Sequence, residues 1–225
     1  MHLNNSILLF STILLSTCSS IPDNIASNFR LAFDSIEAAI FGFEDYPISR
    51  DLVNNIPYAS IRVKIGKGPA GLLILESKTE NLNTWVSADG VSITEKKGQI
   101  VRTTGLINNL TAFRSLQNKT FLKFLASGPI NIPTHYEFLS LDNPEVFELR
   151  LDSQIFFEGN ETVGILDKEF YLAHFSKQKE NKFLRWKVKD HFWIDSKDGF
   201  VWKSIQNIAP NLPPIMIEVT KKPAD

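Results

Sequence analysis

The chain has 225 residues, of which 43% are hydrophobic and 22% are charged, and its formal net charge is -1. This composition is typical of a folded globular protein and excludes disorder as the default state, while the length fits one sizeable domain. The near-neutral charge, with no basic run longer than two residues, excludes a nucleic-acid-binding surface.

An apolar run at residues 7–15 leads toward the one cysteine of the chain, Cys18. The run is too short for the roughly 20 residues that span a bilayer, but it fits the apolar core of a secretory signal. Residues 15–18 (LSTC) resemble the bacterial lipobox, although Thr17 stands where Gly, Ala or Ser is common. We predict a lipoprotein signal peptide over residues 1–17 and lipid attachment at Cys18. The alternatives are an ordinary cleaved signal and a buried N-terminal strand with an incidental cysteine.

A helix is predicted over residues 23–42, because apolar residues recur there at spacings of three and four. These residues are Ile25, Phe29, Ala32, Phe33, Ile36, Ala39 and Ile40. We expect this apolar stripe to pack on or near the rest of the domain. The alternative is a face that contacts a membrane surface or a partner protein.

From residue 56 to about residue 220 the pattern indicates a β domain. Residues 60–65 alternate apolar and polar side chains, which is typical of a strand that is solvated on one face. Turn residues at 66–71, 88–90 and 96–98 separate further short strands, so residues 60–105 are predicted to form a meander of hairpins.

The middle of the chain is less regular, and residues 112–125 are a candidate helix that ends at the Gly- and Pro-containing stretch 127–133. Strands resume after Pro144. They are predicted at 146–151, 155–157, 162–166, 169–176, 182–189, 191–195, 200–204 and 215–220. We therefore expect a mainly β domain over residues 18–225. Roughly ten strands would form a strongly curved antiparallel sheet or β-barrel, which protects the strand edges.

The sequence contains no set of residues that we would assign to catalysis, a cofactor or a metal ion. The four histidines, His2, His135, His174 and His191, lie far apart and show no metal-ligand spacing. We expect His191 to be a hydrogen-bonded edge or core residue, because it directly precedes an aromatic strand. With a single cysteine, the chain can form no internal disulfide and no thiolate metal cluster.

Three other features have a functional and a structural interpretation. Asp195 and Asp198 could act as the paired carboxylates of a glycoside hydrolase, but turn formation with Gly199 explains them better. The loop at residues 66–71 lacks the Gly-Lys-Ser/Thr ending of a phosphate-binding loop. The tryptophans Trp85, Trp193 and Trp202 are expected to fill the core, although indole rings also stack on sugars.

Several blocks resemble the bacterial YjbF/GfcB family of group 4 capsule and exopolysaccharide lipoproteins. The blocks are residues 56–66 (IPYASIRVKIG), 84–90 (TWVSADG) through 98–106 (GQIVRTTGL), 191–206 (HFWIDSKDGFVWKSIQ), 210–213 (PNLP) and 215–219 (IMIEV). With the lipobox, the resemblance covers nearly the whole chain except residues 106–141. It implies a β-barrel-like domain that faces the periplasm, anchored in the outer membrane of a Gram-negative bacterium through Cys18.

The resemblance implies a non-enzymatic accessory role in capsule or exopolysaccharide biosynthesis or export. The expected partners are the membrane and, beyond it, the polysaccharide or the export proteins. An alternative hypothesis is a periplasmic carrier that holds a lipid or glycan in its curved sheet. A polysaccharide hydrolase ranks lowest, because no catalytic residues can be carried over from the family.

Overall fold

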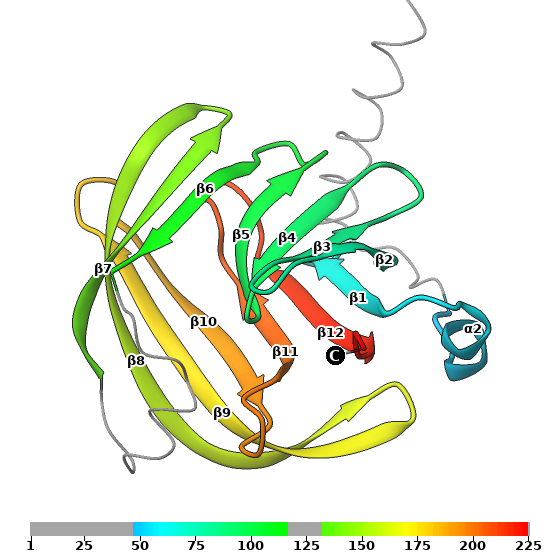
Figure 1. Cartoon of the computed structure of the whole chain (residues 1–225). Coiled ribbons are helices and arrows are strands. Elements are labelled where there is room, and N and C mark those ends of the chain that lie inside the picture. The colour runs from blue at the N-terminus through cyan, green and yellow to red at the C-terminus, as the bar shows by residue number, and fades with distance from the viewer. Residues whose placement is uncertain (1–46, 117–131, 225) are drawn as a thin grey trace, which may run out of the picture.

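The fold is seen in a computed structural model that describes residues 47–116 and 132–224 (Figure 1). In these residues one short helix, α2 (Arg50–Asn55), precedes twelve strands that form one antiparallel sheet. The strands are β1 (Ser60–Ile65), β2 (Ala70–Lys78), β3 (Asn83–Val86), β4 (Ser92–Lys96), β5 (Gln99–Thr104), β6 (Leu110–Ser115), β7 (Ile132–Asp142), β8 (Glu145–Ile165), β9 (Lys168–Asn181), β10 (Trp186–Ile194), β11 (Val201–Gln206) and β12 (Ile215–Lys221). The expected mainly β antiparallel architecture is confirmed.

The sheet is nearly closed into a barrel. Its strand order is β5-β4-β3-β2-β1-β12-β11-β10-β9-β8-β7-β6. Consecutive strands therefore pair, apart from β5 and β6 at the two ends of the order, and β1 also pairs with β12. The end strands β5 and β6 lie against each other, because Thr103 Oγ1 accepts the Leu110 N–H (2.9 Å) and Thr111 O accepts Arg102 Nε–H (3.3 Å). Such closure protects strand edges that would otherwise be exposed.

The pairing of β1 with β12 joins the two ends of the described domain. Alternation places Ile61 and Val63 on the inner face of β1, and the register sets them opposite Val219 and Ile217 of β12. All four side chains are buried in the interior. The period-two pattern of both strands therefore determines which face turns inward.

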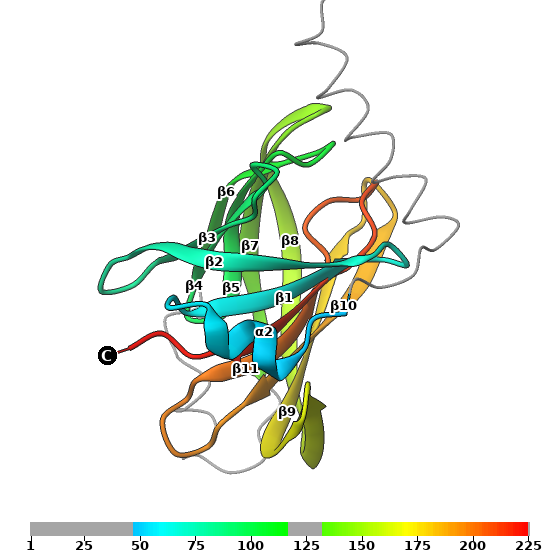
Figure 2. The ribbon, with the colours of Figure 1, turned by 90° about the vertical axis from the view of Figure 1, so that its right-hand side faces the viewer.

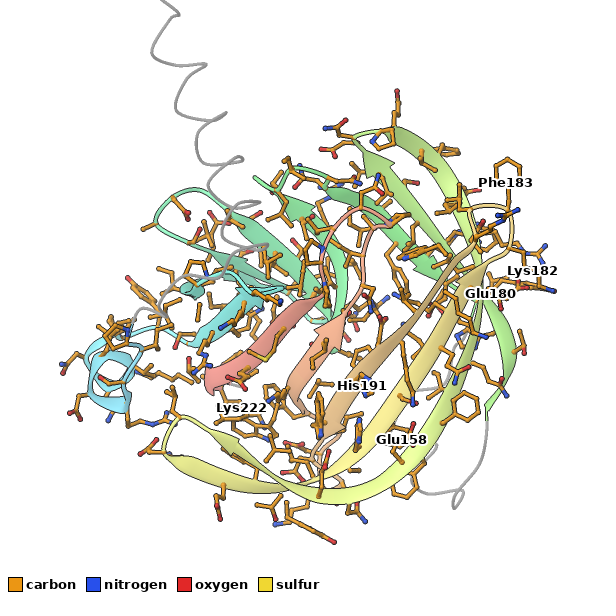
Figure 3. The ribbon with its side chains drawn as sticks, turned by 180° about the vertical axis from the view of Figure 1, so that it is seen from behind. Glu158, Glu180, Lys182, Phe183, His191 and Lys222 are labelled. Atoms are coloured by element: carbon orange, nitrogen blue, oxygen red, sulfur yellow. The ribbon has the colours of Figure 1, made fainter. Side chains whose placement is uncertain are left out.

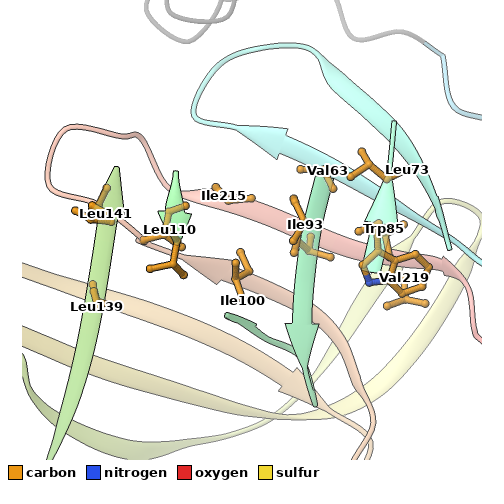
Figure 4. Packing of buried hydrophobic residues seen from close by; sticks show 14 of the residues in the cluster. Val63, Leu73, Trp85, Ile93, Ile100, Leu110, Leu139, Leu141, Ile215 and Val219 are labelled. Atoms are coloured by element: carbon orange, nitrogen blue, oxygen red, sulfur yellow. The ribbon is translucent and has the colours of Figure 1, made fainter. Parts of the chain in front are cut away.

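Buried aliphatic and aromatic side chains from both ends of the sheet meet in the interior (Figure 4). Trp85, Ile93 and Ile100 come from β3, β4 and β5, and Leu110 and Leu139 come from β6 and β7. Each is at most 1% exposed. Burial of a large apolar side chain contributes about 1.5–3 kcal/mol, so this packing favours the nearly closed form of the sheet.

The helix predicted over residues 23–42 lies outside the described residues. The described helix α2 was not predicted, because six residues are too few to show a helical period. It lies next to β1 (Figure 2), and the Ser49 side chain caps it by accepting the Leu52 N–H (3.2 Å). Its Arg50 donates to Asp167 Oδ1 (2.6 Å) and to Thr220 O (2.7 Å). The helix thus ties the turn between β8 and β9 to β12.

Two predictions in the middle of the chain are wrong. Residues 112–115 of the helix predicted over 112–125 belong to strand β6, because hydrogen bonding to β7 and contact with β5 outweigh the local helical spacing. Residues 117–125 lie outside the described residues. The three strands expected between 146 and 166 are a single strand, β8. A bulge between Phe157 and Gly159 bends β8 without interrupting its pairing with β9, so local breaks in the pattern do not end the strand.

The far half of the β8–β9 hairpin bends across the outer face of the sheet toward β12 and α2 (Figure 1). There the hairpin forms a second, smaller apolar cluster with Trp193 and Trp202. The buried residues that the hairpin contributes to this cluster are Val163, Ile165 and Leu172. This outer cluster explains why Trp193 is only 9% exposed although it points away from the barrel interior.

The turn between β4 and β5 provides a sharp test of the packing. Lys97 and Gly98 both have positive φ (51° and 81°), as expected of a two-residue hairpin turn. A Cβ atom on Gly98 would lie 2.5 Å from Cβ of Val201, whereas one on Gly90, also at positive φ, would meet nothing within 4 Å.

We expect Gly98→Ala to lower the free energy of unfolding by about 2–4 kcal/mol and Gly90→Ala by about 1 kcal/mol. Urea denaturation of both variants would test this, and equal losses would contradict it.

Candidate functional site

The predicted lipid attachment site, Cys18, lies outside the described residues. Within residues 47–116 and 132–224 no helix is long and apolar enough to cross a membrane. The same residues contain no group of three or more His, Cys, Asp or Glu side chains arranged to hold a metal ion. The described domain has two clusters of charged and polar side chains, one inside the barrel and one on its outer face, and these are its candidate sites.

The interior ion network is built on β9 and β10. Lys177 and Lys179 point into the barrel and are 3% and 2% exposed. Nζ of Lys179 lies 2.6 Å from Oδ2 of Asp190, and Nζ of Lys177 lies 3.0 Å from Oε1 of Glu137. Buried charges are stable only when they are paired and hydrogen-bonded, and here two lysines face two carboxylates.

Neighbouring strands complete this network. Lys177 also donates to Oε1 of Gln99 (2.6 Å), and Lys179 donates to O of Asn207 (2.6 Å). Burial alone would raise the pKa of Glu137, but Lys177 and the other nearby donors hold it well below its ordinary value. The network therefore links β7, β9 and β10 through charged groups and reaches β5 through the Gln99 amide, which is a structural role.

Three polar atoms beside this network have no hydrogen-bond partner among the described residues. They are Nδ1 of His135, Oγ of Ser153 and Oε2 of Glu137, and all three are buried. His135 and Ser153 lie directly opposite each other in the β7–β8 register. Internal water molecules are the usual partners of such groups, so this part of the interior is suited to hold ordered water.

The second cluster, the outer histidine cluster, lies on the opposite face of β8, β9 and β10 (Figure 3). It consists of Glu158, Glu161, His174, Ser176, Lys189, His191 and Trp193. The rings of His174 and Trp193 stack at 4.7 Å with an interplanar angle of 6°. The cluster combines titratable groups with an exposed carboxylate on each side, so it can bind hydrogen-bond donors.

Hydrogen bonds order the outer histidine cluster. Oε1 of Glu161 accepts from Nε1 of Trp193 and lies 3.2 Å from Nδ1 of His174. Nε2 of His174 is 2.9 Å from Nδ1 of His191. On the other side, Oε1 of Glu158 accepts from Oγ of Ser176 (2.5 Å) and from Nζ of Lys189 (2.8 Å). Burial lowers the pKa of both histidines, which favours their neutral forms.

Sequence reasoning did not bring His174 and His191 together. The predicted strand over residues 182–189 concealed the hairpin, because Lys182–Arg185 form the turn and β10 begins at Trp186. With the turn at that position, pairing alone places His174 opposite Trp193 and Ser176 opposite His191. A correct turn assignment was the signal that could have found the cluster. The prediction that His191 is hydrogen-bonded is confirmed.

The other residues for which the sequence suggested a possible function have structural roles in the described domain. Oδ1 of Asp195 accepts the Lys197 N–H and Oδ1 of Asp198 accepts the Phe200 N–H, as turn formation predicts. Trp85 is fully buried in the main core. Trp202 packs between Phe170 and Phe200, with ring centroids at 4.3 and 5.1 Å. Residues 66–69 of the predicted loop connect β1 and β2 in a hairpin, and residues 70–71 already belong to β2.

Comparison with known proteins identifies the family. Residues 33–220 match the family described as group 4 capsule polysaccharide lipoprotein gfcB, YjbF. The chain belongs to the YjbF family. Two similar proteins are the uncharacterized lipoproteins GfcB and YjbF of Escherichia coli K12. Each is 21% identical to this chain. The first match covers 84% of this chain and 87% of GfcB, and the second covers 95% and 96%.

A solved structure has the same fold. The crystal structure of the hypothetical lipoprotein YmcC from Escherichia coli K12 superposes with a TM-score of 0.66 at 21% identity. The superposition covers 85% of this chain and 96% of the YmcC chain. The fold of this YjbF family member is therefore similar to that of a hypothetical lipoprotein.

Proposed function

We propose that this protein is a non-enzymatic accessory lipoprotein of capsule or exopolysaccharide secretion. In this proposal Cys18 carries the lipid and holds the domain on the periplasmic side of the outer membrane of a Gram-negative cell. The observation that carries the proposal is the family match over residues 33–220, to a family described as capsule polysaccharide lipoproteins. The lipobox-like residues 15–18 and the lipoprotein names of the relatives support it.

The packing of the described domain supports a role that depends on the outer surface. Inward-facing side chains such as Trp85, Phe175 and Phe192 are at most 1% exposed, and paired lysines and carboxylates occupy another part of the interior. A carrier of a lipid or glycan would instead need an interior space of ligand size. We therefore favour an anchored domain that contacts polysaccharide or export proteins from outside.

The anchor is tested by replacing Cys18. We expect the Cys18→Ala variant to leave the membrane fraction or to remain an uncleaved precursor, because the lipid chains of a mature lipoprotein provide stable anchoring. Ser16→Ala is the matched control, since it keeps a small residue in the lipobox and should stay membrane-bound. Fractionation followed by a salt wash distinguishes the two, and a Cys18→Ala variant that still sediments with the outer membrane would contradict the anchor.

The role in secretion is tested in the same strains. Deletion of the gene is expected to reduce surface polysaccharide, and the natural chain should restore it while Cys18→Ala does not. Unchanged surface polysaccharide after deletion would overturn the proposed role. Because Ser19, and not Asp, follows the cysteine, we expect Ser19→Asp to keep the lipid but to shift the protein toward the inner membrane in a density gradient.

A further inference from the structure

We propose that the outer histidine cluster is a binding site for the hydroxyl groups of a neutral sugar segment. This inference rests on the proposed function, because the secreted polysaccharide would supply that segment. The site is formed by side chains of three neighbouring strands, and Figure 3 shows its members His191 on β10 and Glu158 on β8. The argument depends on which hydrogen-bonding atoms the cluster leaves unused.

The hydrogen-bond chain determines the tautomers of both histidines. Nδ1 of His174 lies 3.2 Å from Oε1 of Glu161, and because a carboxylate can only accept, this contact favours the tautomer with the proton on Nδ1. In the neutral ring Nε2 of His174 is then an acceptor, and Nδ1 of His191 donates to it across 2.9 Å. Nε2 of His191 is therefore left as an unprotonated acceptor, and it has no partner among the described residues.

The two carboxylates follow the same pattern. In each of Glu158 and Glu161, Oε1 receives both protein contacts, and Oε2 has no hydrogen-bond partner among the described residues. The side chains are 35% and 49% exposed, so these oxygens are accessible. Together with Nε2 of His191, the cluster presents three acceptors. Its nearest exposed donor, Lys189, is already bound to Glu158.

The three free acceptors select a ligand that is rich in hydrogen-bond donors. Sugar hydroxyl groups each supply a donor, and two carboxylates with one ammonium group disfavour an acidic sugar. Lys203 on the neighbouring strand is paired with Glu218 at 2.9 Å and is not free to offset that charge. Stacking contributes little, because Trp193 is buried between His174 and Lys203. Recognition is therefore by hydrogen bonds at the strand surface.

Binding should also depend on pH with a defined sign. Protonation would turn Nε2 of His191 from an acceptor into a donor, so a hydroxyl group that donates to Nε2 would have to reorient and accept instead. The groups that face it are His174 on β9, Glu158 and Glu161 on β8 and Lys189 on its own strand. We expect constant affinity from pH 8 to 7 and a loss of affinity below the ordinary histidine pKa of about 6.5.

The test is a titration of the full chain, purified in detergent, with neutral oligosaccharides from partial hydrolysis of the host cell's surface polysaccharide. His191→Phe keeps an aromatic ring but removes Nε2, and we expect about tenfold weaker binding. Lys187→Ala, an exposed residue on the same face of β10, is the matched control and should bind as the natural chain does. Thermal unfolding of each variant confirms that the fold is retained.

Three results would overturn the inference. They are undetectable binding to the natural chain, equal loss in the Lys187→Ala and His191→Phe variants, and preferential binding of spermidine, which would identify a site for amines. These outcomes are separate from the proposed function. If Cys18-dependent polysaccharide secretion persists while the natural chain binds no oligosaccharide, the sugar site is wrong and the accessory role stands.

Discussion

Replacing Asp190 by alanine is expected to lower the free energy of unfolding by about 3–5 kcal/mol, because it leaves a buried charge without its partner. Asp190 is fully buried, and its carboxylate lies 2.6 Å from Nζ of Lys179 and 3.9 Å from Nζ of Lys177. Oδ1 also accepts the Asn207 N–H at 2.8 Å. Burial already lowers the pKa of Lys179, and removal of Asp190 would lower it further.

Urea denaturation at pH 7 measures this effect. The matched control is Lys222→Ala, which breaks the exposed ion pair with Asp198 at 2.6 Å and should cost at most about 1 kcal/mol. A double variant, Asp190→Leu with Lys179→Met, removes both charges and should recover most of the stability that Asp190→Ala loses. If Asp190→Ala unfolds at the same urea concentration as the natural chain, the interior ion network has no structural role.

Replacing Glu95 by glutamine is expected to stabilise the protein at pH 8 by about 3 kcal/mol and to have little effect at pH 4.5. Glu95 is 6% exposed on the inner face of β4. Burial raises its pKa from 4.5 to about 7, and the neighbouring Trp85 and Asn83 side chains offset only part of that cost. Glutamine resembles the protonated carboxyl group in shape but carries no charge at any pH.

The sign follows from the raised pKa of Glu95. Between pH 4.5 and 7 the folded state binds more protons than the unfolded state, so the contribution of this group to stability falls as pH rises. The measured quantity is the difference in unfolding free energy between Glu95→Gln and the natural chain at several pH values, which cancels the titration of other groups. Glu80→Gln, at an exposed position, is the control. A difference that does not grow with pH would contradict the prediction.

Much of the fold could be predicted because its strands carry local signals. The alternation of β1, the turns at Asp89–Gly90 and Lys97–Gly98, and the return of strands after Pro144 are short-range patterns, and each is present in the structure. The predictions failed where a strand depends on its neighbours. Residues 112–115 are extended because β7 pairs with them, and β8 continues through a bulge that resembles a break in sequence.

The candidate sites were less accessible to sequence reasoning. Lys177 and Lys179 have the alternation of a solvated strand face, yet they point into the interior because Asp190 and Glu137 reach them from other strands. His174 and His191 meet only when the β9–β10 turn is placed at Lys182–Arg185. In both cases the decisive partner lies on another strand, and composition gives no information on register.

By itself, the sequence determined the class of the domain, the alternation of β1, and the likeness to a lipoprotein family with Cys18 at its predicted anchor. These properties follow from side-chain periodicity, turn residues and local motifs. Only the tertiary structure decided that β1 closes on β12, that two lysines are buried in ion pairs and that two histidines form one hydrogen-bonded cluster. The reason is physical: strand register and near-closure of the sheet are set by packing between residues that are distant in the chain.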